Sequence, residues 1–188
     1  MRRDNYGASL AEALRKKGLS YYWTWIPVKV GYDKYDEGLA IFSKSPILSS
    51  CVFNLSASDD YYNWKTRKTL GIHTEKGWFF TVHMGWWKDK EDPFAEQWAK
   101  LRNHCAEKER CLLMGDFNSP AHLEGEGYSL ITADGWQDAW RIAKNRDEGI
   151  TVGGKIDGWR EGKDDAMRID FAFLRGLPAP DRSRVIFN

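Results

Sequence analysis

The chain has 188 residues, enough for one domain with a substantial core. Its formal net charge of +1 excludes an overall basic field that would attract nucleic acids, so only a local basic patch could do so. No apolar stretch is long enough to cross a bilayer, and residues 1–5 lack the apolar core of a secretory signal. The three cysteines, Cys51, Cys105 and Cys111, are scattered and lack metal-ligand spacing, which predicts buried, reduced thiols in a cytoplasmic protein.

Hydrophobic spacing in the first half of the chain predicts one helix followed by five strands. Leu10 and Leu14 lie one helical turn apart, and the basic residues 15–17 before Gly18 suit a helix C-terminus. Aromatic and β-branched residues predict the strands, the first of which is expected to stop at Pro27. The expected segments are 5–17 for the helix and 21–26, 38–42, 47–55, 65–74 and 78–82 for the strands. The last of these is a near-continuous apolar run, which is typical of a strand covered on both faces.

The second half of the chain alternates between helix and strand. A helix is predicted from about Pro93 to Glu107, with one apolar side formed by Phe94, Trp98, Leu101 and Cys105. The later expected segments are a buried strand at 111–114, polar glycine-rich chain, a short helix at 135–141, a long loop at 150–166, a strand at 169–174 and the start of a strand at 185–187. Several strands among few helices, some apolar on both faces, predict packed sheets with helices outside.

The strand 111–114 runs into Gly115-Asp116-Phe117-Asn118, where apolar residues give way abruptly to polar ones. If the backbone stays extended, Asp116 and Asn118 share one face and Phe117 turns to the other, because side chains alternate along a strand. A carboxylate and an amide that converge in this way suit a site that orients water and phosphate oxygens around Mg²⁺. The alternative is that Asp116 and Asn118 are ordinary turn residues.

This tip resembles the hallmark of the endonuclease/exonuclease/phosphatase superfamily, which has the DNase I-like fold. The three other matching stretches, in the family's order, are Asp-Glu-Gly-Leu-Ala-Ile-Phe-Ser at 36–43, Phe-Thr-Val-His-Met at 80–84 and Arg-Ile-Asp-Phe-Ala-Phe at 168–173. Four motifs in order are far more specific than any one of them. The resemblance implies a single α/β (α+β) domain over residues 1–188, a four-layer sandwich in which two mixed β-sheets pack face to face between flanking helices.

The same resemblance pairs His83, at the end of a buried strand, with Glu37. A carboxylate that accepts from one ring nitrogen fixes the tautomer and favours the imidazolium, which leaves the other nitrogen to contact a phosphate oxygen. The alternatives are that His83 is a core or edge residue and that Glu37 is a solvated loop residue.

Asp170 interrupts an apolar strand two residues after Arg168, on the same face. A charged residue in such a run needs a partner if it is buried, so an Arg168–Asp170 structural pair is one interpretation. The resemblance implies instead that Asp170 orients a second catalytic histidine and leaves Arg168 to contact substrate.

The resemblance also predicts what this chain lacks. The family begins with a strand bearing a metal-proximal Asn and a strand ending in a metal-binding Glu, and it closes with an Asp-His. This chain starts at what resembles the helix after those two strands and stops within the strand before the Asp-His. His73, His104 and His122 match no motif that would replace the lost histidine. The expectation is therefore a domain that is incomplete at both termini.

The activity that the resemblance implies is metal-assisted hydrolysis of a phosphoric ester. One Mg²⁺ or Mn²⁺ ion held by Asp116 and Asn118 would polarise the phosphoryl oxygen, while Asp116 orients or deprotonates the attacking water. Asn118 and His83 would stabilise charge on the phosphoryl oxygens.

The substrate that the resemblance implies is a small phosphorylated sugar. Residues 31–38 and 83–88 look closest to the bacterial sugar-phosphate phosphatase branch, in particular the maltose 6′-phosphate phosphatases. Tyr35, Trp86 and Trp87 would stack on apolar sugar faces, and near-neutral charge suits a small anion better than a polyanion. Packing in the core or at its rim is the alternative for Trp86 and Trp87.

Two other functions remain open at this point. A DNase I-like endonuclease or phosphodiesterase would need a basic groove, for which Lys65, Arg67 and Lys68 are candidates, although alternation along a strand splits them between faces. A catalytically dead binding remnant would follow from the missing ligands.

Overall fold

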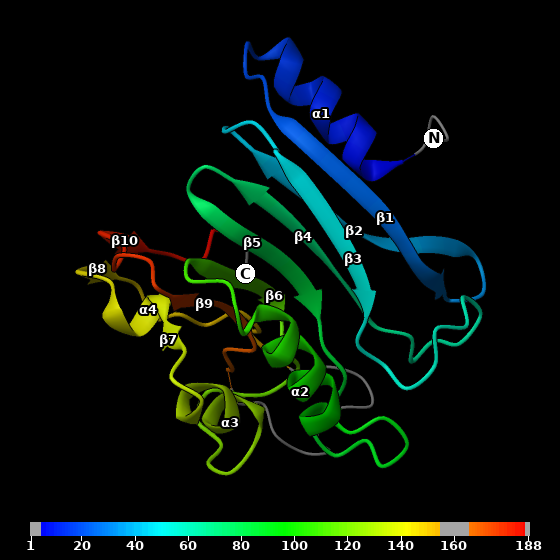
Figure 1. The fold of residues 1–188 in the computed structure, drawn as a ribbon, viewed down its shortest axis with the longest axis vertical. Coiled ribbons are helices and arrows are strands. Elements are labelled where there is room, and N and C mark those ends of the chain that lie inside the picture. Colours follow the sequence, from blue (N-terminus) through cyan, green and yellow to red (C-terminus); the bar gives the residue numbers. More distant parts are fainter. Residues whose placement is uncertain (1–4, 155–165, 187–188) are drawn as a thin grey trace.

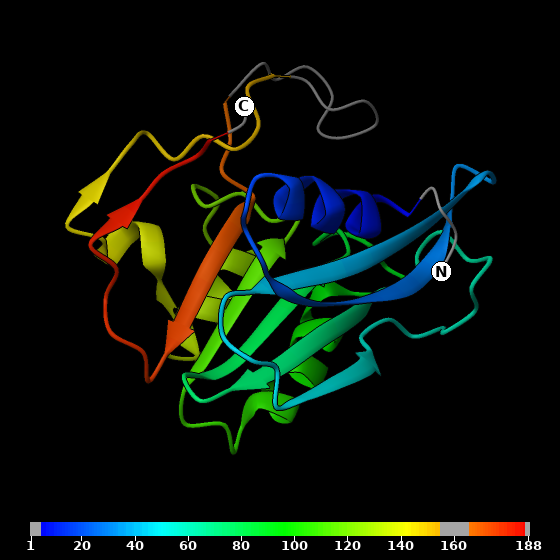
Figure 2. The ribbon, with the colours of Figure 1, turned by 90° about the horizontal axis from the view of Figure 1, so that it is seen from above.

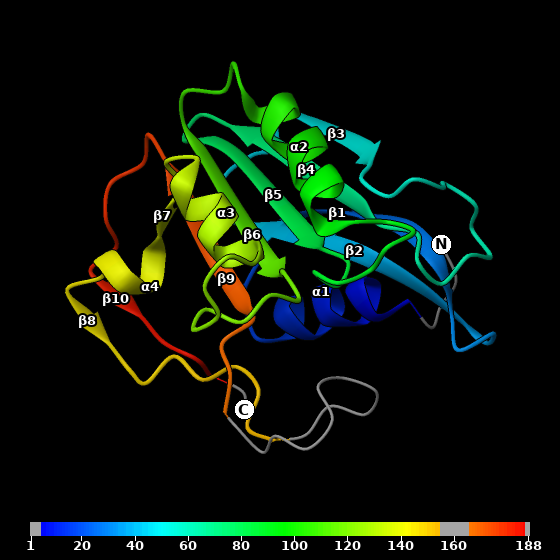
Figure 3. The same cartoon turned by 90° about the horizontal axis from the view of Figure 1, so that it is seen from below.

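The computed structural model describes residues 5–154 and 166–186, which form four layers (Figures 1 and 2). The outermost layer is helix α1 (Tyr6–Lys16), which covers an antiparallel sheet of β1 (Tyr22–Gly31) and β2 (Tyr35–Ser43). A six-stranded sheet lies beneath, and α2 (Phe94–Cys105) and α3 (Gly127–Ala133) cover its other face (Figure 3). The predicted arrangement of packed sheets between helices is confirmed. None of the described helices has the length and apolar character needed to cross a membrane.

The larger sheet has the strand order β3-β4-β5-β6-β9-β7. Its strands are β3 (Ser49–Asn54), β4 (Lys68–Thr74), β5 (Gly77–His83), β6 (Cys111–Asp116), β9 (Asp170–Arg175) and β7 (Gln137–Asp138). Among the described strands of this sheet, only β5 and β6 are parallel neighbours, and α2 carries the chain back between them, as a parallel pair requires. Beside this sheet lie α4 (Ala139–Ile142) and a short parallel pair, β8 (Asn145–Arg146) with β10 (Arg182–Ser183).

The main core fills the space between the large sheet and its helices. Alternate residues of the central strands, among them Phe80, Leu113 and Phe173, are fully buried against α2 and α3. The predicted apolar side of α2 is confirmed, since Phe94, Trp98, Leu101 and Cys105 are all buried. Burial of these large side chains supplies the main stabilising contribution.

A second, smaller core joins the two sheets. Ile41 of β2 packs with Leu70 and Ile72 of β4, and Phe79 of β5 lies against them. Because Phe80 points into the other core, β5 is covered on both faces, as its apolar run predicted. On the outer side of the small sheet, Gly7 of α1 packs close to the indole of Trp23.

The three thiols are free. The Sγ atoms of Cys105 and Cys111 lie 3.9 Å apart, a hydrogen-bond distance rather than a disulfide, and both residues are buried. Cys51 is half-buried. The prediction of reduced thiols agrees with this geometry.

Three strand boundaries in the first half differ from the prediction by three residues or more, and one of them is the start of β4, at Lys68 in place of residue 65. β1 does not stop at Pro27 but continues to Gly31, with a register shift between Pro27 and Lys29. A bulge at the edge of a two-stranded sheet tolerates the missing N–H of proline, which is why Pro27 does not break the strand. β2 starts earlier than expected, at Tyr35, because it pairs with this extended part of β1.

The second half contains an unpredicted helix, α3, within the glycine-rich stretch. Tyr128 and Ile131 bury one side of α3 in the main core, so tertiary packing offsets its weak local preference. The helix expected at 135–141 is limited to α4, which follows the short strand β7. The strand expected at 185–187 is absent at Val185 and Ile186, and its last residue lies outside the described residues, as does much of the loop expected at 150–166.

Gly115 allows β5 and β6 to approach closely at the tip. Its φ is +135°, a conformation that other residues rarely adopt, and a Cβ placed there would lie 2.1 Å from the carbonyl oxygen of Val82. Glycine is therefore required at this position by both backbone conformation and space.

We expect Gly115→Ala to lower the free energy of unfolding by roughly 2–4 kcal/mol, because the clash is with backbone and the φ is strained. Gly153→Ala is the matched control, since a Cβ there meets nothing within 4 Å. Chemical denaturation of both variants measures the difference. Equal stability of the two variants would contradict this account of the tip.

Candidate active site

Three strands of the large sheet bring acidic and imidazole side chains to one edge. His83 ends β5 and Asp116 ends the parallel strand β6, so the two carboxyl ends meet and the residues pair in register. β9 runs antiparallel to β6, so its first residue, Asp170, lies opposite Asp116 at the same edge. Chain direction in the sheet therefore places these three side chains side by side.

Glu37 reaches this edge from the other sheet. Its Oε1 lies 3.4 Å from Nδ1 of His83, and Nε2 of the same ring lies 3.7 Å from Oδ2 of Asp116. His83 therefore lies between two carboxylates, with about a third of each side chain exposed to solvent. The predicted proximity of Glu37 and His83 is present in the structure.

The electrostatic environment shifts the two carboxyl groups in opposite directions. The hydrogen bond from His83 lowers the pKa of Glu37 to about 2, with Lys29 adding to the effect against the opposing effect of burial. Burial raises the pKa of Asp116, and His83 counteracts this rise. Glu37 thus stays ionised, whereas Asp116 holds a proton more readily than an ordinary aspartate.

Two buried cations, Lys29 and Arg67, lie near Glu37 and attract its negative charge. Sequence reasoning did not place either of them in the site. Lys29 Nζ lies 3.5 Å from Glu37 Oε1, and both Lys29 and Arg67 are buried. Burial lowers the pKa of both groups, while the charge of Glu37 favours their protonated forms. Nε of Arg67 has no hydrogen-bond partner in the described part of the chain. Lys29 lies beyond the predicted strand end at Pro27, and Arg67 lies just before β4, so no local pattern in the sequence predicted that either cation is buried.

The tip does not stay extended as the sequence argument assumed. β6 ends at Asp116, and Asn118 has a φ of +45°. The backbone N–H of Asn118 donates to Oδ1 of Asp116 at 2.7 Å, so the carboxylate also closes the turn. The Asn118 side chain donates through Nδ2 to the carbonyl of Met84 at 2.7 Å. Phe117 is fully buried on the other side, as predicted.

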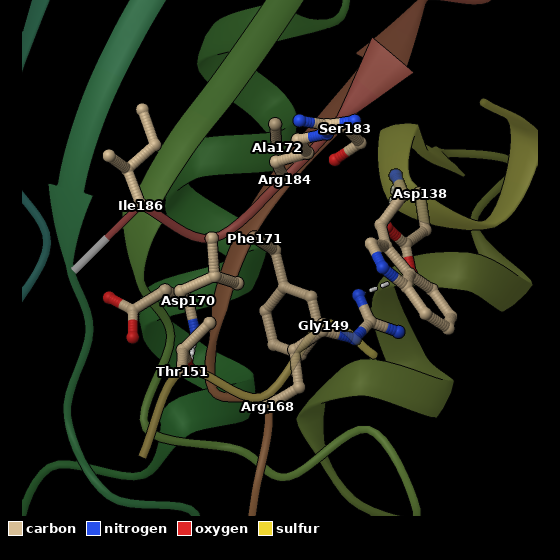
Figure 4. Close-up of a pocket in the computed structure, with 12 residues that line it drawn as sticks. Asp138, Gly149, Thr151, Arg168, Asp170, Phe171, Ala172, Ser183, Arg184 and Ile186 are labelled. Carbon is tan, nitrogen blue, oxygen red and sulfur yellow. Dashed lines mark hydrogen bonds and ion pairs between the residues drawn. The ribbon is translucent and has the colours of Figure 1, made fainter. Parts of the chain in front are cut away.

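Asp170 borders a cavity of about 460 Å³ that is open between β9 and the segment 183–186. Its backbone N–H donates to Oγ1 of Thr151 at 3.2 Å, and its side chain is exposed. Figure 4 shows its carboxylate pointing away from the side of the cavity that carries Asp138. Asp170 therefore borders this cavity and also lies at the edge that carries His83 and Asp116.

Arg168 turns to the opposite side of the same cavity (Figure 4). Its Nη1 donates to Oδ2 of buried Asp138 at 2.7 Å, and its guanidinium stacks on the rings of Trp140 and Phe171. The structural partner of Arg168 is thus Asp138, in place of the Asp170 considered from the sequence. This stacked ion pair fixes the shape of the cavity wall.

The three aromatic residues proposed to contact substrate have different surroundings. Tyr35 and Trp86 are exposed, at the start of β2 and in the loop after β5. Trp87 is half-buried and packs against Phe94, with ring centroids 5.7 Å apart. The packing interpretation therefore accounts for Trp87, while the rings of Tyr35 and Trp86 face solvent.

The oxygen atoms at the edge suit a hard divalent cation in kind. Asp116 offers Oδ2, and Asn118 can offer its amide oxygen because its nitrogen is already bonded to Met84. The described residues contain no group of three His, Cys, Asp or Glu side chains close enough to hold a metal ion by themselves. Mg²⁺ commonly takes only one or two carboxylates and completes its shell with water and phosphate oxygens, so the residues present fit such an ion.

Comparison with known proteins gives a consistent assignment. The family model described as "Endonuclease/Exonuclease/phosphatase family" matches residues 3–188. No curated protein sequence gives a significant match. Among solved structures, a protein of the same family description from Leptotrichia buccalis superposes with a TM-score of 0.83 and 27% identity, over 100% of this chain and 73% of that one.

Two more distant structures carry functional names. A mannosyl-6-phosphatase from Bacteroides thetaiotaomicron has a TM-score of 0.56 and 19% identity, over 89% of this chain and 75% of its own. A 3′ phosphatase from Neisseria, bound to a product DNA hairpin, has a TM-score of 0.56 and 15% identity, over 93% of this chain and 72% of its own. At these identities the likeness concerns the fold.

The depressed pKa of Glu37 predicts how stability depends on pH. Its stabilising effect is present above the ordinary pKa of 4.5 and is lost as pH falls through about 2. We therefore expect the difference in unfolding free energy between wild type and Glu37→Gln, about 1 kcal/mol because solvent screens the pair, to shrink over that range.

Denaturation at a series of pH values measures this difference. Asp181→Asn, which removes an exposed pair with Lys144, is the control and should change stability less. A Glu37→Gln difference that stayed constant down to pH 2 would contradict the pairing with His83.

Proposed function

Because the chain belongs to the endonuclease/exonuclease/phosphatase family, whose members hydrolyse phosphoric esters, we propose that it is a divalent-metal-dependent phosphatase acting on a small sugar phosphate. The observation that carries this proposal is the convergence of His83, Asp116 and Asp170 at one sheet edge, with Glu37 facing them from the other sheet. Hydrolysis adds water to phosphorus, breaks the bond to the ester oxygen, and leaves a sugar and inorganic phosphate.

We assign each residue at the edge a proposed role that is consistent with its contacts. Glu37 holds the His83 ring, so that its other nitrogen can donate to a phosphate oxygen when the ring is protonated. Asp116 orients the attacking water and accepts its proton. Asn118 stabilises charge on the phosphoryl oxygens. Asp170, which borders the cavity, has the role that the family resemblance implies, namely to orient a second catalytic histidine.

The metal ion is proposed to be Mg²⁺ or Mn²⁺, held by Asp116 and Asn118 together with water and substrate oxygens. When bound, it would supply positive charge that polarises the phosphoryl oxygen and neutralises the leaving oxygen. Lys29 and Arg67 add fixed positive charge behind Glu37, which favours binding of an anion at this edge.

A sugar phosphate is favoured over nucleic acid by charge and by surface chemistry. The net charge is +1, and the exposed aromatic rings of Tyr35 and Trp86 can stack on the apolar faces of a sugar. Of the basic residues considered for nucleic acid, Arg67 is buried and Lys65 pairs with Asp89 and Glu91. The name of one structural neighbour, a mannosyl-6-phosphatase, agrees with this substrate class. The three free thiols support the proposal of a cytoplasmic enzyme.

We expect the protein to release inorganic phosphate from sugar phosphates such as maltose 6′-phosphate, and His83→Ala to lower kcat/KM by roughly 100-fold or more. His73→Ala is the control, because His73 stacks on Trp78 at the far end of β4. A phosphate-release assay across sugar phosphates measures both. Nicking of plasmid DNA by a folded protein that releases no phosphate from any sugar phosphate would contradict the proposal.

Metal dependence is a separate prediction. Chelation with EDTA should abolish phosphate release, and Mg²⁺ or Mn²⁺ should restore it. Asp116→Asn should raise the metal concentration needed for half-maximal activity, since it removes the charged ligand. Full activity after exhaustive chelation would rule out the metal role given to Asp116 and Asn118.

A further inference from the structure

One peptide group, between Met84 and Gly85, connects the carboxyl end of β5 to helix α2. It follows His83, the last residue of β5. Its carbonyl accepts a hydrogen bond from Nδ2 of Asn118 at 2.7 Å, and its N–H donates to Oε1 of Gln97 at 2.8 Å. Because a peptide group is planar, these two bonds hold one rigid plane from opposite sides. The orientation of Asn118 is therefore linked to that of Gln97.

Gln97 itself is held in one orientation. It is 1% exposed and belongs to the first turn of α2, which lies near the end of β5 (Figure 3). Its Nε2 donates to Oδ2 of Asp92 at 2.9 Å and to the Asp92 carbonyl at 3.2 Å. The other carboxylate oxygen of Asp92 accepts from the N–H of Ala57 at 3.0 Å. Since both carboxylate oxygens accept, the amide nitrogen of Gln97 must face Asp92 and its oxygen must face Gly85.

Burial makes each of these hydrogen bonds costly to lose. Met84, Gln97 and Asp92 are each exposed by 5% or less. A buried donor or acceptor without a partner loses its hydration and gains nothing in return. The contact is also close, because a Cβ added to Gly85 would lie 2.5 Å from Nε2 of Gln97. The side chains of Gln97 and Asp92 therefore hold the peptide as one unit.

The hydrogen bond to Asn118 decides which atom of its side chain is left for a ligand. With Nδ2 bonded to the Met84 carbonyl, the amide oxygen can meet a cation. If the peptide rotated by half a turn, its N–H would face Asn118, and the amide would turn its oxygen to that donor instead. Gly85 has no Cβ, so its own backbone preference does not prevent this rotation. The bond from Gly85 to Gln97 does oppose it.

We propose that Gln97 is a positioning residue, which holds the Met84–Gly85 peptide so that Asn118 presents its amide oxygen at the edge. Asp92 fixes the orientation of Gln97 in turn. The inference rests on the proposed function for the role of Asn118 in holding a divalent cation. Gln97 acts through the peptide and takes no part in the chemical step.

The orientation is tested by NMR on the ¹⁵N-labelled protein without metal or substrate. The side-chain NH₂ resonance of Asn118 is assigned from its absence in Asn118→Asp. Gln97→Met keeps the size of the side chain and loses its hydrogen bonds, so the resonance should move to the position of an unbonded amide. Thr74→Val, which removes a buried hydroxyl at the far end of β4, is the control. An unchanged Asn118 resonance in Gln97→Met would overturn the proposal.

A reciprocal exchange at positions 97 and 92 covers the case in which Gln97→Met does not fold. Gln97→Glu alone places two carboxyl groups together, and Asp92→Asn alone places two amides together, so each should displace the Asn118 resonance. In the double variant the carboxylate at 97 accepts from Gly85 and from the amide at 92, whose oxygen accepts from Ala57. The resonance should then return to its wild-type position. A displaced resonance in the double variant, or a double variant that does not fold, would contradict the assigned role.

Binding of Mn²⁺, followed by electron paramagnetic resonance without substrate, tests the consequence for the site. Gln97→Met should lower the affinity roughly 10-fold, and the double variant should restore it to within about 2-fold. Equal affinity of wild type and Gln97→Met would overturn the proposal. Absence of Mn²⁺ binding by the wild type would instead contradict the proposed function, and the Asn118 resonance would still decide whether Gln97 orients the amide.

Discussion

The parallel pairing of β5 with β6 is the constraint on which the rest of the site depends. It brings the carboxyl ends of two central strands, with His83 and Asp116, to one edge of the sheet. The pairing requires Gly115, because a side chain there would strike the carbonyl of Val82. With β9 antiparallel on the far side of β6, Asp170 joins the same edge. One arrangement of hydrogen bonds therefore decides both the centre of the fold and the position of its polar side chains.

The two sheets are joined by two kinds of contact with different physical consequences. Away from the edge, Ile41, Leu70 and Ile72 bury apolar area, which stabilises the packing without specifying a direction. At the edge, Glu37 meets His83 and Lys29, and these contacts depend on distance and orientation. Burial removes water from the charged groups of Lys29 and Arg67, which costs free energy. This cost is offset because nearby carboxylates attract the two charges and carbonyl oxygens accept hydrogen bonds from them. The apolar contacts thus stabilise the packing of the two sheets, and the charged contacts determine how the sheets are aligned at the edge.

Aromatic residues of this protein lie both in its core and on its surface. In the main core, the rings of Phe80, Phe117 and Phe173 fill the space between the central strands and the helices. The contact between the rings of Phe117 and Phe173 packs the segment after β6 against β9. At the surface, exposed Trp64 and Trp86 lie on loops whose carbonyls accept hydrogen bonds, from Lys29 at Trp64 and from the N–H of Asp89 at Trp86. Under the proposed function, exposed rings of this kind would contact the uncharged part of a small phosphorylated substrate.

The sequence by itself determined the elements whose signals are local. The alternation of side chains predicted that Phe117 is buried, and the spacing of Phe94, Trp98 and Leu101 predicted the apolar side of α2. The four motifs indicated the family and the pairing of Glu37 with His83. Local patterns missed α3, because its stability comes from core packing, and the extension of β1 past Pro27, because a bulge and a partner strand make it possible. Only the tertiary structure decided that Arg168 pairs with Asp138, that Asn118 turns its amide to Met84, and that Lys29 links Glu37 to Trp64. These partners are distant in sequence or depend on a turn conformation, and electrostatic and hydrogen-bond energies depend on distances in space that residue order alone does not contain.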